Sequence, residues 1–368
     1  MSEPRRKRLR NEQQAAVSAI EIEAVPTGTR NSADILRARD LRIWYAGPKG
    51  PVQAVDGVSF ALRPGEVLGL VGESGCGKST LGRGLMGLLP RGAAIDGGLV
   101  FAGTDLLRLS PKERERLRGA GMGLIFQEPM TRLDPLMRIS DHFTEELKVH
   151  EPDLSRREAR DRALEALRAL GIPPTRYRNY PHEFSGGMRQ RIMIALALAL
   201  RPKFIVADEP TTALDVLVEA QILHILADIR VRYSAAILLI THNLGIIAEA
   251  CDRVAVMYAG KIVEQGPVRE IFAEPRHPYT QELLRSTISL TTRVLHSIPG
   301  APPDLVDPPP ACRFHPRCPH AMHVCAARQP PQFAESGHVA DCWLLSDHLT
   351  VADRQPLRRA EVAVADEA

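Results

Sequence analysis

The sequence predicts an α/β fold with a largely parallel sheet, and three observations support this prediction. Between about residues 36 and 266, short apolar runs typical of buried strands alternate with helical patterns, as in chains that join parallel strands through helices. A glycine-rich loop joins one of these runs to a helix. Beyond residue 266, prolines crowd residues 299–319 and exclude regular helix or a central strand there. We therefore expect an α/β domain over 36–266 and a small Pro/Cys-rich extension over 267–368.

The length and composition place the chain among ordinary globular proteins. It has 368 residues, room for about two domains, of which 44% are hydrophobic and 25% charged. These values exclude a mostly disordered chain, a collagen-like chain and a small disulfide scaffold. The formal net charge of +3 is too small to indicate nucleic-acid binding, and we expect no nucleic-acid partner.

Membrane-spanning and secretory segments are not expected. The longest apolar runs, residues 192–200 and 235–240, are far shorter than the ~20 residues that cross a bilayer. The N-terminus is basic, but no apolar stretch follows it as a secretory signal requires. We expect a cytoplasmic protein that does not cross a membrane by itself and whose six cysteines form no structural disulfides.

Residues 1–35 are predicted to form a flexible basic extension, because they show no sustained apolar period. Five basic side chains cluster there: Arg5, Arg6, Lys7, Arg8 and Arg10. This cluster could contact anionic lipid or nucleic acid, but a solvated tail is the commoner outcome for such charge runs.

The glycine-rich loop follows an apolar run at 66–71, predicted as a buried strand, and precedes a helix expected over 81–89. The phosphate loop, as we name residues 72–80, consists of Gly72, Glu73, Ser74, Gly75, Cys76, Gly77, Lys78, Ser79 and Thr80. Its glycines permit a tight turn in which backbone N–H groups converge on phosphate oxygens, and the helix adds its positive N-terminus. We expect Lys78 to reach the β- and γ-phosphates and Ser79 to bind Mg²⁺. This strand–loop–helix arrangement predicts a bound nucleoside triphosphate.

A second apolar run, residues 203–209, is predicted as a strand that ends in two acids, Asp208 and Glu209. An aspartate at this position can hold Mg²⁺, and the neighbouring glutamate can orient or deprotonate an attacking water. A solvated strand end is an equally good explanation of the acid pair when it is considered alone.

A third motif lies between these two. Ser185, Gly186 and Gly187 open a helical run, which offers another anion site at a helix N-terminus. The order of the three motifs resembles that of nucleotide-binding subunits of ATP-binding-cassette (ABC) transporters. Their signature is commonly Leu-Ser-Gly-Gly-Gln, and here Phe184 replaces the leucine and Met188 the glutamine. The resemblance implies that the Ser-Gly-Gly residues meet the γ-phosphate.

The resemblance assigns roles to four further residues. Gln127 is similar to the Q-loop glutamine, which contacts Mg²⁺ or water and senses the membrane partner, and Asp215 to the D-loop aspartate at the dimer interface. His242 is similar to the switch histidine that touches the γ-phosphate; Asn243 follows it where the family usually has Asp, which could alter the imidazole's tautomer or orientation. Tyr45 resembles the aromatic residue that stacks on adenine, although it and the adjacent Trp44 could instead be packing residues.

The implied fold is the P-loop NTPase of an ABC cassette: a parallel-sheet core, an antiparallel β subdomain and a helical subdomain at about 130–200. One helix of this subdomain is predicted directly, because Ser155 and Glu158 fit a capping box and Gly171 with Pro173 ends the helix. Its apolar stripe consists of Ala159, Ala163, Leu164, Leu167 and Leu170. The stripe is mostly a packing surface; the resemblance implies that the subdomain also docks on membrane subunits.

The C-terminal extension narrows the resemblance. Residues 275–280, 297–303 and 312–319 are similar to segments of oligopeptide/dipeptide importer ATPases. Four cysteines lie there, Cys312, Cys318, Cys325 and Cys342, without the paired C-x2-C spacing of zinc knuckles. Four thiolates can hold a [4Fe–4S] cluster, which the resemblance implies. Zinc, with help from His315, His320 or His323, and unligated thiols remain alternatives.

The resemblance implies an ATP-hydrolysing subunit that energises uptake of di- or oligopeptides, or of a related solute such as nickel, glutathione or an opine. Its implied partners are a second ABC ATPase, identical or different, two permease subunits and a solute-binding protein, at the cytoplasmic face of a bacterial inner membrane. ATP and Mg²⁺ would be held between the phosphate loop and the partner's Ser-Gly-Gly helix. Lys78, Gln127, Glu209 and His242 would be the catalytic residues.

Two other functions are weighed against this one. An ABC ATPase without a membrane partner, acting on nucleic acid or ribosomes, commonly has two cassettes or a long coiled coil, whereas this chain has one cassette and no sustained heptads. A regulatory subunit that no longer hydrolyses ATP would lack the acid pair or the Ser-Gly-Gly motif, and both are present.

Overall fold

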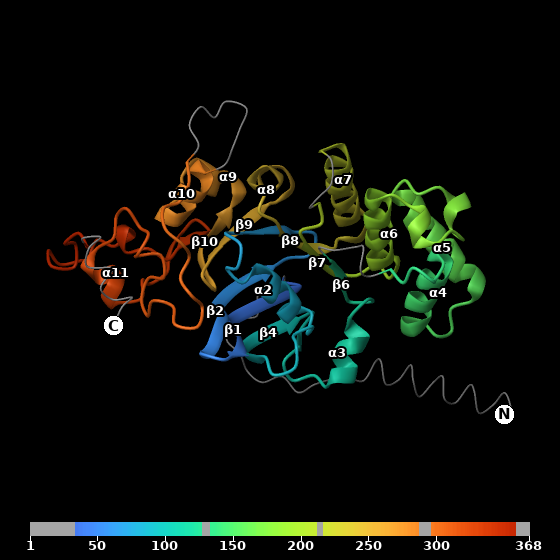
Figure 1. Cartoon of the computed structure of the whole chain (residues 1–368), viewed down its shortest axis with the longest axis horizontal. Coiled ribbons are helices and arrows are strands. Elements are labelled where there is room, and N and C mark those ends of the chain that lie inside the picture. The colour runs from blue at the N-terminus through green and yellow to red at the C-terminus, as the bar shows by residue number, and fades with distance from the viewer. Residues whose placement is uncertain (1–33, 127–132, 212–215, 287–295, 358–368) are drawn as a thin grey trace. The chain divides into compact units, whose positions relative to one another are not determined.

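The computed structural model describes residues 34–126, 133–211, 216–286 and 296–357 (Figure 1). The predicted flexible extension therefore lies, up to residue 33, outside the described residues. The same holds for Gln127 and Asp215, whose assigned roles remain predictions.

The main sheet has eight strands in the order β11-β12-β10-β9-β3-β8-β7-β6. Its strands are β3 (Val67–Val71), β6 (Met122–Ile125), β7 (Phe204–Asp208), β8 (Ala236–Ile240), β9 (Arg253–Tyr258), β10 (Lys261–Pro267), β11 (Phe333–Glu335) and β12 (His338–Ala340). The five strands from β9 to β6 pair in parallel, and β10, β12 and β11 extend the sheet in antiparallel fashion. The predicted parallel core is thus confirmed.

The central strands are buried on both faces. Every residue of β3, β7 and β8 is buried, which explains why these segments read as continuous apolar runs rather than alternating ones. One face of β7 and β8, including Val206 and Leu238, packs with α2 (Lys78–Leu85) and the smaller sheet. The opposite face, including Ile205 and Leu239, packs with α6 (Gly186–Ala199) and α7 (Val216–Tyr233).

A second, four-stranded sheet is wholly antiparallel, in the order β2-β1-β4-β5, and lies beside α2 (Figure 1). Its strands are β1 (Leu36–Gly47), β2 (Gly50–Leu62), β4 (Ala94–Phe101) and β5 (Thr104–Asp105), and α3 (Pro111–Leu117) follows. Its buried side chains, such as Leu36 and Ile43, belong to the same core as those of β3 and α2. This sheet is the antiparallel β subdomain that the sequence led us to expect.

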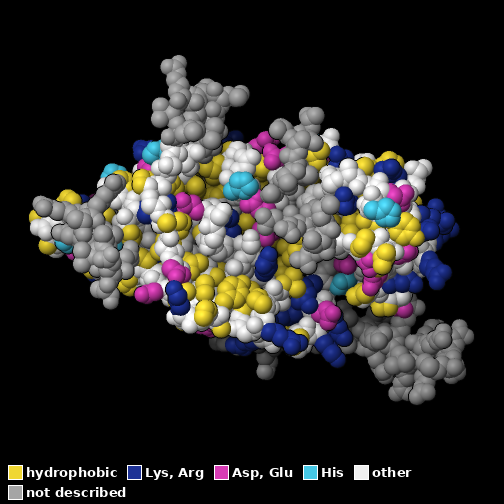
Figure 2. All heavy atoms as spheres, viewed as in Figure 1, with side chains coloured by type: hydrophobic (Ala, Val, Ile, Leu, Met, Phe, Trp, Pro, Cys, Tyr) yellow, Lys and Arg dark blue, Asp and Glu magenta, His cyan; other side chains and the backbone are white. Residues whose placement is uncertain are grey.

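The helical subdomain contains α4 (Ile139–His150), α5 (Arg156–Ala169) and α6, which share one core. The predicted capping box is present: Glu158 N–H donates to Ser155 Oγ at 3.2 Å, and Ser155 N–H donates to the Glu158 carboxylate at 2.9 Å. All five residues of the predicted stripe are buried. Lys and Arg side chains cover the outer surface where α5 lies (Figure 2). The amphipathic helix is therefore confirmed, with its apolar side packed inward.

The helix after the phosphate loop is shorter than predicted. It was expected to run over 81–89, but α2 ends at Leu85. Gly87 adopts a left-handed conformation with φ of 64°, which ends an α-helix two residues earlier.

The described residues after β10 include three short α-helices, α9 (Val268–Ala273), α10 (Pro278–Arg285) and α11 (His323–Ala327), besides β11 and β12. Residues 296–322 contain neither α-helix nor strand, as their prolines predict. Because β12 pairs with β10 through Glu264 and Gln265, the C-terminal segment continues the main sheet. Within the described ranges, no helix is both long enough and apolar enough to span a bilayer.

Candidate functional site

The phosphate loop turns tightly between β3 and α2. Gly72 and Gly77 have φ values of 153° and 107°, and a Cβ on either would lie 2.0 Å from a backbone oxygen, that of Met257 or Ala54. Lys78 is buried, and its Nζ donates to the carbonyl oxygens of Gly72 at 2.8 Å and Glu73 at 3.0 Å. Among the described side chains none caps α2, so its first backbone N–H groups are left without a side-chain acceptor. The arrangement suits a bound phosphate.

Two predicted Mg²⁺ ligands from distant parts of the chain meet at this loop. Ser79 Oγ donates to Asp208 Oδ1 at 3.0 Å, which brings together the start of α2 and the end of β7. Burial raises the pKa of the Asp208 carboxyl, and the hydrogen bond from Ser79 partly opposes this effect. A hydroxyl and a carboxylate are the kinds of oxygen ligand that Mg²⁺ takes in nucleotide sites.

Glu209 and His242 also meet. His242 Nδ1 lies 2.9 and 2.8 Å from the two carboxylate oxygens of Glu209. Glu209 adopts φ of 51° and its N–H donates to Ile240 O, so the residue turns out of β7 beside the end of β8. His242 is 69% exposed, whereas Glu209 is 12% exposed. The pair therefore presents an imidazole to solvent above a largely covered carboxylate.

Asn243, which stands where the resemblance predicts an aspartate, caps a helix. Its side-chain oxygen accepts from Gly245 N–H at 2.9 Å and caps α8 (Leu244–Ala250), as an aspartate would. The asparagine therefore supplies the N-cap of α8 directly after His242.

Tyr45 lies at the edge of the phosphate loop. Its hydroxyl donates to Thr80 Oγ1 at 3.3 Å, and its ring packs against the core that contains α2. The neighbouring Trp44 buries its indole N–H, which has no hydrogen-bond partner among the described residues. Of the two aromatic residues, Tyr45 is the one that contacts the loop.

Comparisons with known proteins identify the family. A family model described as "ABC transporter" matches residues 55–212, and one described as "Oligopeptide/dipeptide transporter, C-terminal region" matches residues 263–325. The oligopeptide transport ATP-binding protein OppD of Escherichia coli K12 is 44% identical over 331 residues, which cover 89% of this chain and 98% of the relative. The chain belongs to the ATP-binding proteins of ABC transporters.

Further comparisons agree with this assignment. The dipeptide transport ATP-binding protein DppD of Bacillus subtilis is 47% identical over 317 residues, 84% of this ABC protein and 94% of the relative. A dimeric structure of the ATP-binding cassette MJ0796, bound to ADP and Pi after hydrolysis, has a TM-score of 0.58 and 25% identity. The structural match covers 64% of this chain and 99% of the MJ0796 chain. The ABC ATPase fold and the ATPase class are thereby established, and an ATPase acting on nucleic acid or ribosomes is not favoured.

The Ser-Gly-Gly motif of this ABC ATPase opens α6, and the motif's first two residues are exposed. Ser185 Oγ accepts from Met188 N–H at 3.4 Å as the helix N-cap. Further along α6, the buried Gln190 donates to Pro210 O at 2.8 Å and ties the helix to the segment after Glu209. Sequence reasoning missed Gln190, although a polar residue on the apolar side of a helix was a signal for it.

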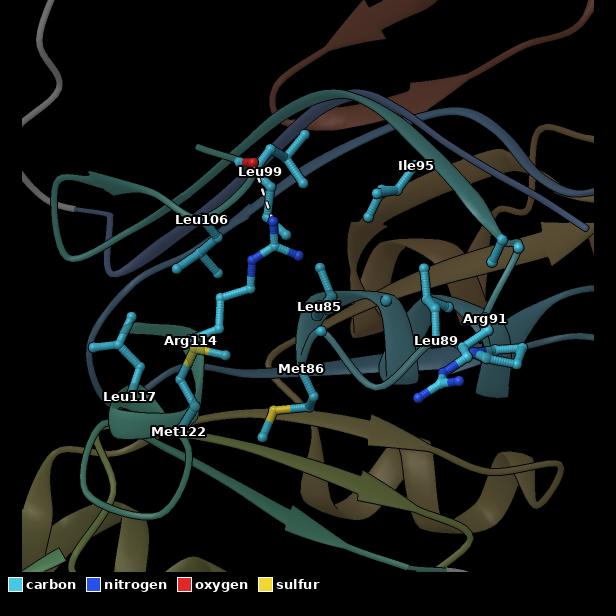
Figure 3. A pocket seen from close by; sticks show the side chains of 16 residues that line it. Leu85, Met86, Leu89, Arg91, Ile95, Leu99, Leu106, Arg114, Leu117 and Met122 are labelled. Carbon is cyan, nitrogen blue, oxygen red and sulfur yellow. Dashed lines mark hydrogen bonds between the residues drawn. The ribbon is translucent and has the colours of Figure 1, made fainter. Parts of the chain in front are cut away.

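A cavity of about 300 Å³ lies away from these residues, between the end of α2, β4 and α3 (Figure 3). Apolar side chains such as Leu85 and Met122 line it, together with Arg91 and Arg114. Arg114 Nη2 donates to Leu107 O at 3.2 Å. None of the described residues assigned to nucleotide binding lines this cavity.

The four C-terminal cysteines gather although 30 residues separate the first from the last. Burial raises the pKa of Cys312, and the thiols of Cys325, Cys318 and Cys342 raise it further. Burial likewise raises the pKa of Cys318 and of Cys342 to about 12. Within the described part of the chain, no group of three or more His, Cys, Asp or Glu side chains could bind a single metal ion.

Backbone N–H groups point at these sulfurs. The N–H of the residue two positions later bonds to the sulfur in three cases, from Phe314 to Cys312, His320 to Cys318 and Leu344 to Cys342. Such donors stabilise a thiolate, the form in which cysteine binds metals.

Proposed function

We propose that this ABC ATPase hydrolyses ATP to energise the uptake of di- or oligopeptides, or of a related solute such as nickel, glutathione or an opine. The observation that carries the proposal is the match of residues 263–325 to the C-terminal region of oligopeptide/dipeptide transporters, together with 44–47% identity to OppD and DppD. A second ABC ATPase, two permease subunits and a solute-binding protein would complete the importer. The chain would lie peripherally on the cytoplasmic face of a bacterial inner membrane.

The geometry of the site supports a role for each described residue. The phosphate loop would hold the triphosphate, with Lys78 on the β- and γ-phosphates and Tyr45 against the adenine. Ser79 and Asp208 would hold Mg²⁺, whose charge neutralises the phosphates, and Gln127 is proposed as a further ligand. Glu209, steadied by His242, would accept a proton from the attacking water, while His242 contacts the γ-phosphate.

The Ser-Gly-Gly motif would act on a partner's nucleotide. Ser185 and Gly186 are exposed at the start of α6. Together with Gly187 they would meet a γ-phosphate held by a second cassette, with Asp215 crossing the same interface. The dimeric structure of the MJ0796 cassette bound to ADP and Pi supports this arrangement by analogy. ATP would favour the closed pair because it contacts both cassettes, and hydrolysis would remove that preference.

The four-cysteine site is proposed to hold a [4Fe–4S] cluster. Its donor set is all thiol, its sulfurs accept backbone N–H bonds, and each thiol lies within electrostatic range of the other three. The cluster would join Cys312, Cys318, Cys325 and Cys342 into one unit and stabilise the extension.

Anaerobic purification followed by iron, acid-labile sulfide and zinc analysis tests the cluster. We expect about four iron atoms per chain with visible absorbance, and loss of both in Cys318→Ser. Cys251→Ser is the matched control, because Cys251 is a partly buried thiol elsewhere in the fold. A colourless protein that contains zinc, or no metal at all, would contradict the proposal.

Reconstitution of the complete importer in proteoliposomes tests the function. With ATP inside and the solute-binding protein outside, we expect uptake of labelled di- or oligopeptides. Glu209→Gln should assemble normally and support no uptake. If peptides are not taken up but another solute is, the motor assignment stands and the peptide assignment fails.

A further inference from the structure

A side chain of the C-terminal extension forms an ion pair with the phosphate loop. Arg317 donates to both carboxylate oxygens of Glu73, from Nη1 to Oε2 at 2.6 Å and from Nη2 to Oε1 at 3.0 Å. The arginine side chain is 5% exposed and that of Glu73 is 25% exposed. A two-bonded, nearly buried pair of this kind fixes both position and orientation.

Arg317 is itself held firmly. It donates to Pro299 O at 2.9 Å, Ile298 O at 3.3 Å and Tyr258 Oη at 3.3 Å. Beside it, Phe314 packs edge-on against Tyr258 with ring centroids 5.1 Å apart. Because these contacts place the guanidinium before any ligand binds, Arg317 acts as a rigid support for Glu73.

Three residues hold Glu73 through hydrogen bonds. Its side chain is bonded to Arg317, its N–H donates to Tyr279 Oη at 2.9 Å, and its carbonyl oxygen accepts from Lys78 Nζ. Lys78 is the residue assigned to the β- and γ-phosphates. A movement of Glu73 therefore changes the surroundings of that lysine directly.

The contact between Arg317 and Glu73 is electrostatic as well as structural, because Glu73 is charged. A carboxylate within a loop that binds a triphosphate repels the ligand unless a cation neutralises it. Arg317 supplies that cation from a segment 244 residues away in sequence. We propose that Arg317 is a positioning residue for nucleotide binding: it neutralises Glu73 and fixes the phosphate loop, so that the Cys312–Cys318 segment sets the affinity for ATP.

Arg313 provides a matched control within the same segment. It is as buried as Arg317 and pairs with Asp56 at 2.6 Å, while also donating to Gln53 at 2.8 Å. It thus anchors the same extension to β2 and, by donating to Ala259 O, to the turn between β9 and β10, without bonding to a residue of the phosphate loop. A general loosening of the extension would follow from either substitution, whereas an effect through Glu73 would follow only from that of Arg317.

The test measures the dissociation constant of a fluorescent, non-hydrolysable ATP analogue with Mg²⁺ on the full-length protein, alongside its thermal midpoint. We expect Arg317→Gln to weaken binding about tenfold and Arg317→Lys, which keeps the charge but not the two-bonded fork, to give an intermediate value. Adding Glu73→Gln to Arg317→Gln should recover at least about threefold of the lost affinity, because the uncompensated charge is gone. Arg313→Gln should lower the thermal midpoint and leave the dissociation constant within about threefold of wild type.

Two results would overturn the proposal: unchanged affinity in Arg317→Gln, or a double variant that binds no better than Arg317→Gln. If Arg317→Gln does not fold, the dissociation constants of Arg317→Lys and of the double variant are compared with that of wild type instead. An affinity of Arg317→Lys equal to that of wild type, or a double variant that binds no better than Arg317→Lys, would then overturn the proposal. The proposal depends on the ATP site alone, and not on the peptide cargo or the cluster. A wild-type protein that failed to bind the analogue would instead count against the assigned nucleotide site.

Discussion

His242 Nδ1 lies 2.8 Å from Oε2 of Glu209, so the loop after β8 steadies the acid that follows β7. The two strands pair in parallel, with Asp208 beside Ile240, and their ends bring the two side chains together. This relationship joins the proposed base to the residue proposed to contact the γ-phosphate.

Glu209→Gln is expected to reduce ATP turnover by about 10²–10⁴-fold, because the amide cannot accept a proton from water. ATP affinity should be retained, since the change is nearly isosteric and the phosphate loop is untouched. Steady-state ATPase rates of the assembled complex and equilibrium binding of ATP measure the two quantities. Near-normal turnover would remove Glu209 from its proposed role.

His242→Ala should lower kcat at least about tenfold with little effect on KM, because the imidazole's contact with Glu209 is lost. His242→Gln retains a hydrogen-bonding side chain and should recover part of the rate. A loss confined to KM would show that His242 serves binding rather than turnover.

Asp208→Asn should have opposite effects on the free protein and on the nucleotide complex. Burial raises the pKa of the Asp208 carboxyl, so its ionised form is costly in the fold and the penalty is relieved as the pH falls through that raised pKa. At neutral pH without Mg²⁺ the variant should therefore unfold at a higher temperature than wild type.

Mg²⁺ and ATP should add little to the thermal stability of the Asp208→Asn variant. Ligand at a hundred times its dissociation constant adds about 2.7 kcal/mol to the stability of the wild-type protein. Thermal scans with and without Mg–ATP at pH 7 separate the two effects. An Asp208→Asn protein that Mg–ATP stabilises as strongly as wild type would exclude Asp208 as a ligand.

Gln190→Met tests the link between α6 and the segment after Glu209. The change leaves the buried Pro210 oxygen without its donor and should cost about 1–3 kcal/mol in the free energy of unfolding. Gln221→Met, at an exposed position of α7, is the control and should change stability by less than about 0.5 kcal/mol. Equal effects in denaturant titrations would contradict the role given to the Gln190 hydrogen bond.

Much of the core could be predicted because it is encoded locally. The apolar runs at 66–71, 203–209 and 235–240 became β3, β7 and β8, and Ser155 with Glu158 formed the expected capping box. The end of α2 was misjudged because Gly87 stops the helix before Pro90 is reached.

Long-range relationships could not be predicted from local patterns. The pairing of β12 with β10 involves three-residue strands, too short for a periodic signal. The Ser79–Asp208 contact spans 129 residues; it followed only from motif knowledge, and the Arg317–Glu73 pair has no motif at all. Charge complementarity between distant residues becomes visible only when the fold brings them together.

The proposed ATPase site is completed only when two cassettes pair, and the ATPase rate per molecule as a function of concentration tests this most directly. The purified chain is titrated with its partner ATPase, or with itself, at saturating Mg–ATP. We predict that the rate rises from near zero to a plateau as pairs form. Ser185→Tyr on the cassette that contributes the Ser-Gly-Gly motif should suppress this rate. A constant rate per molecule at every concentration, unaffected by Ser185→Tyr, would contradict the account.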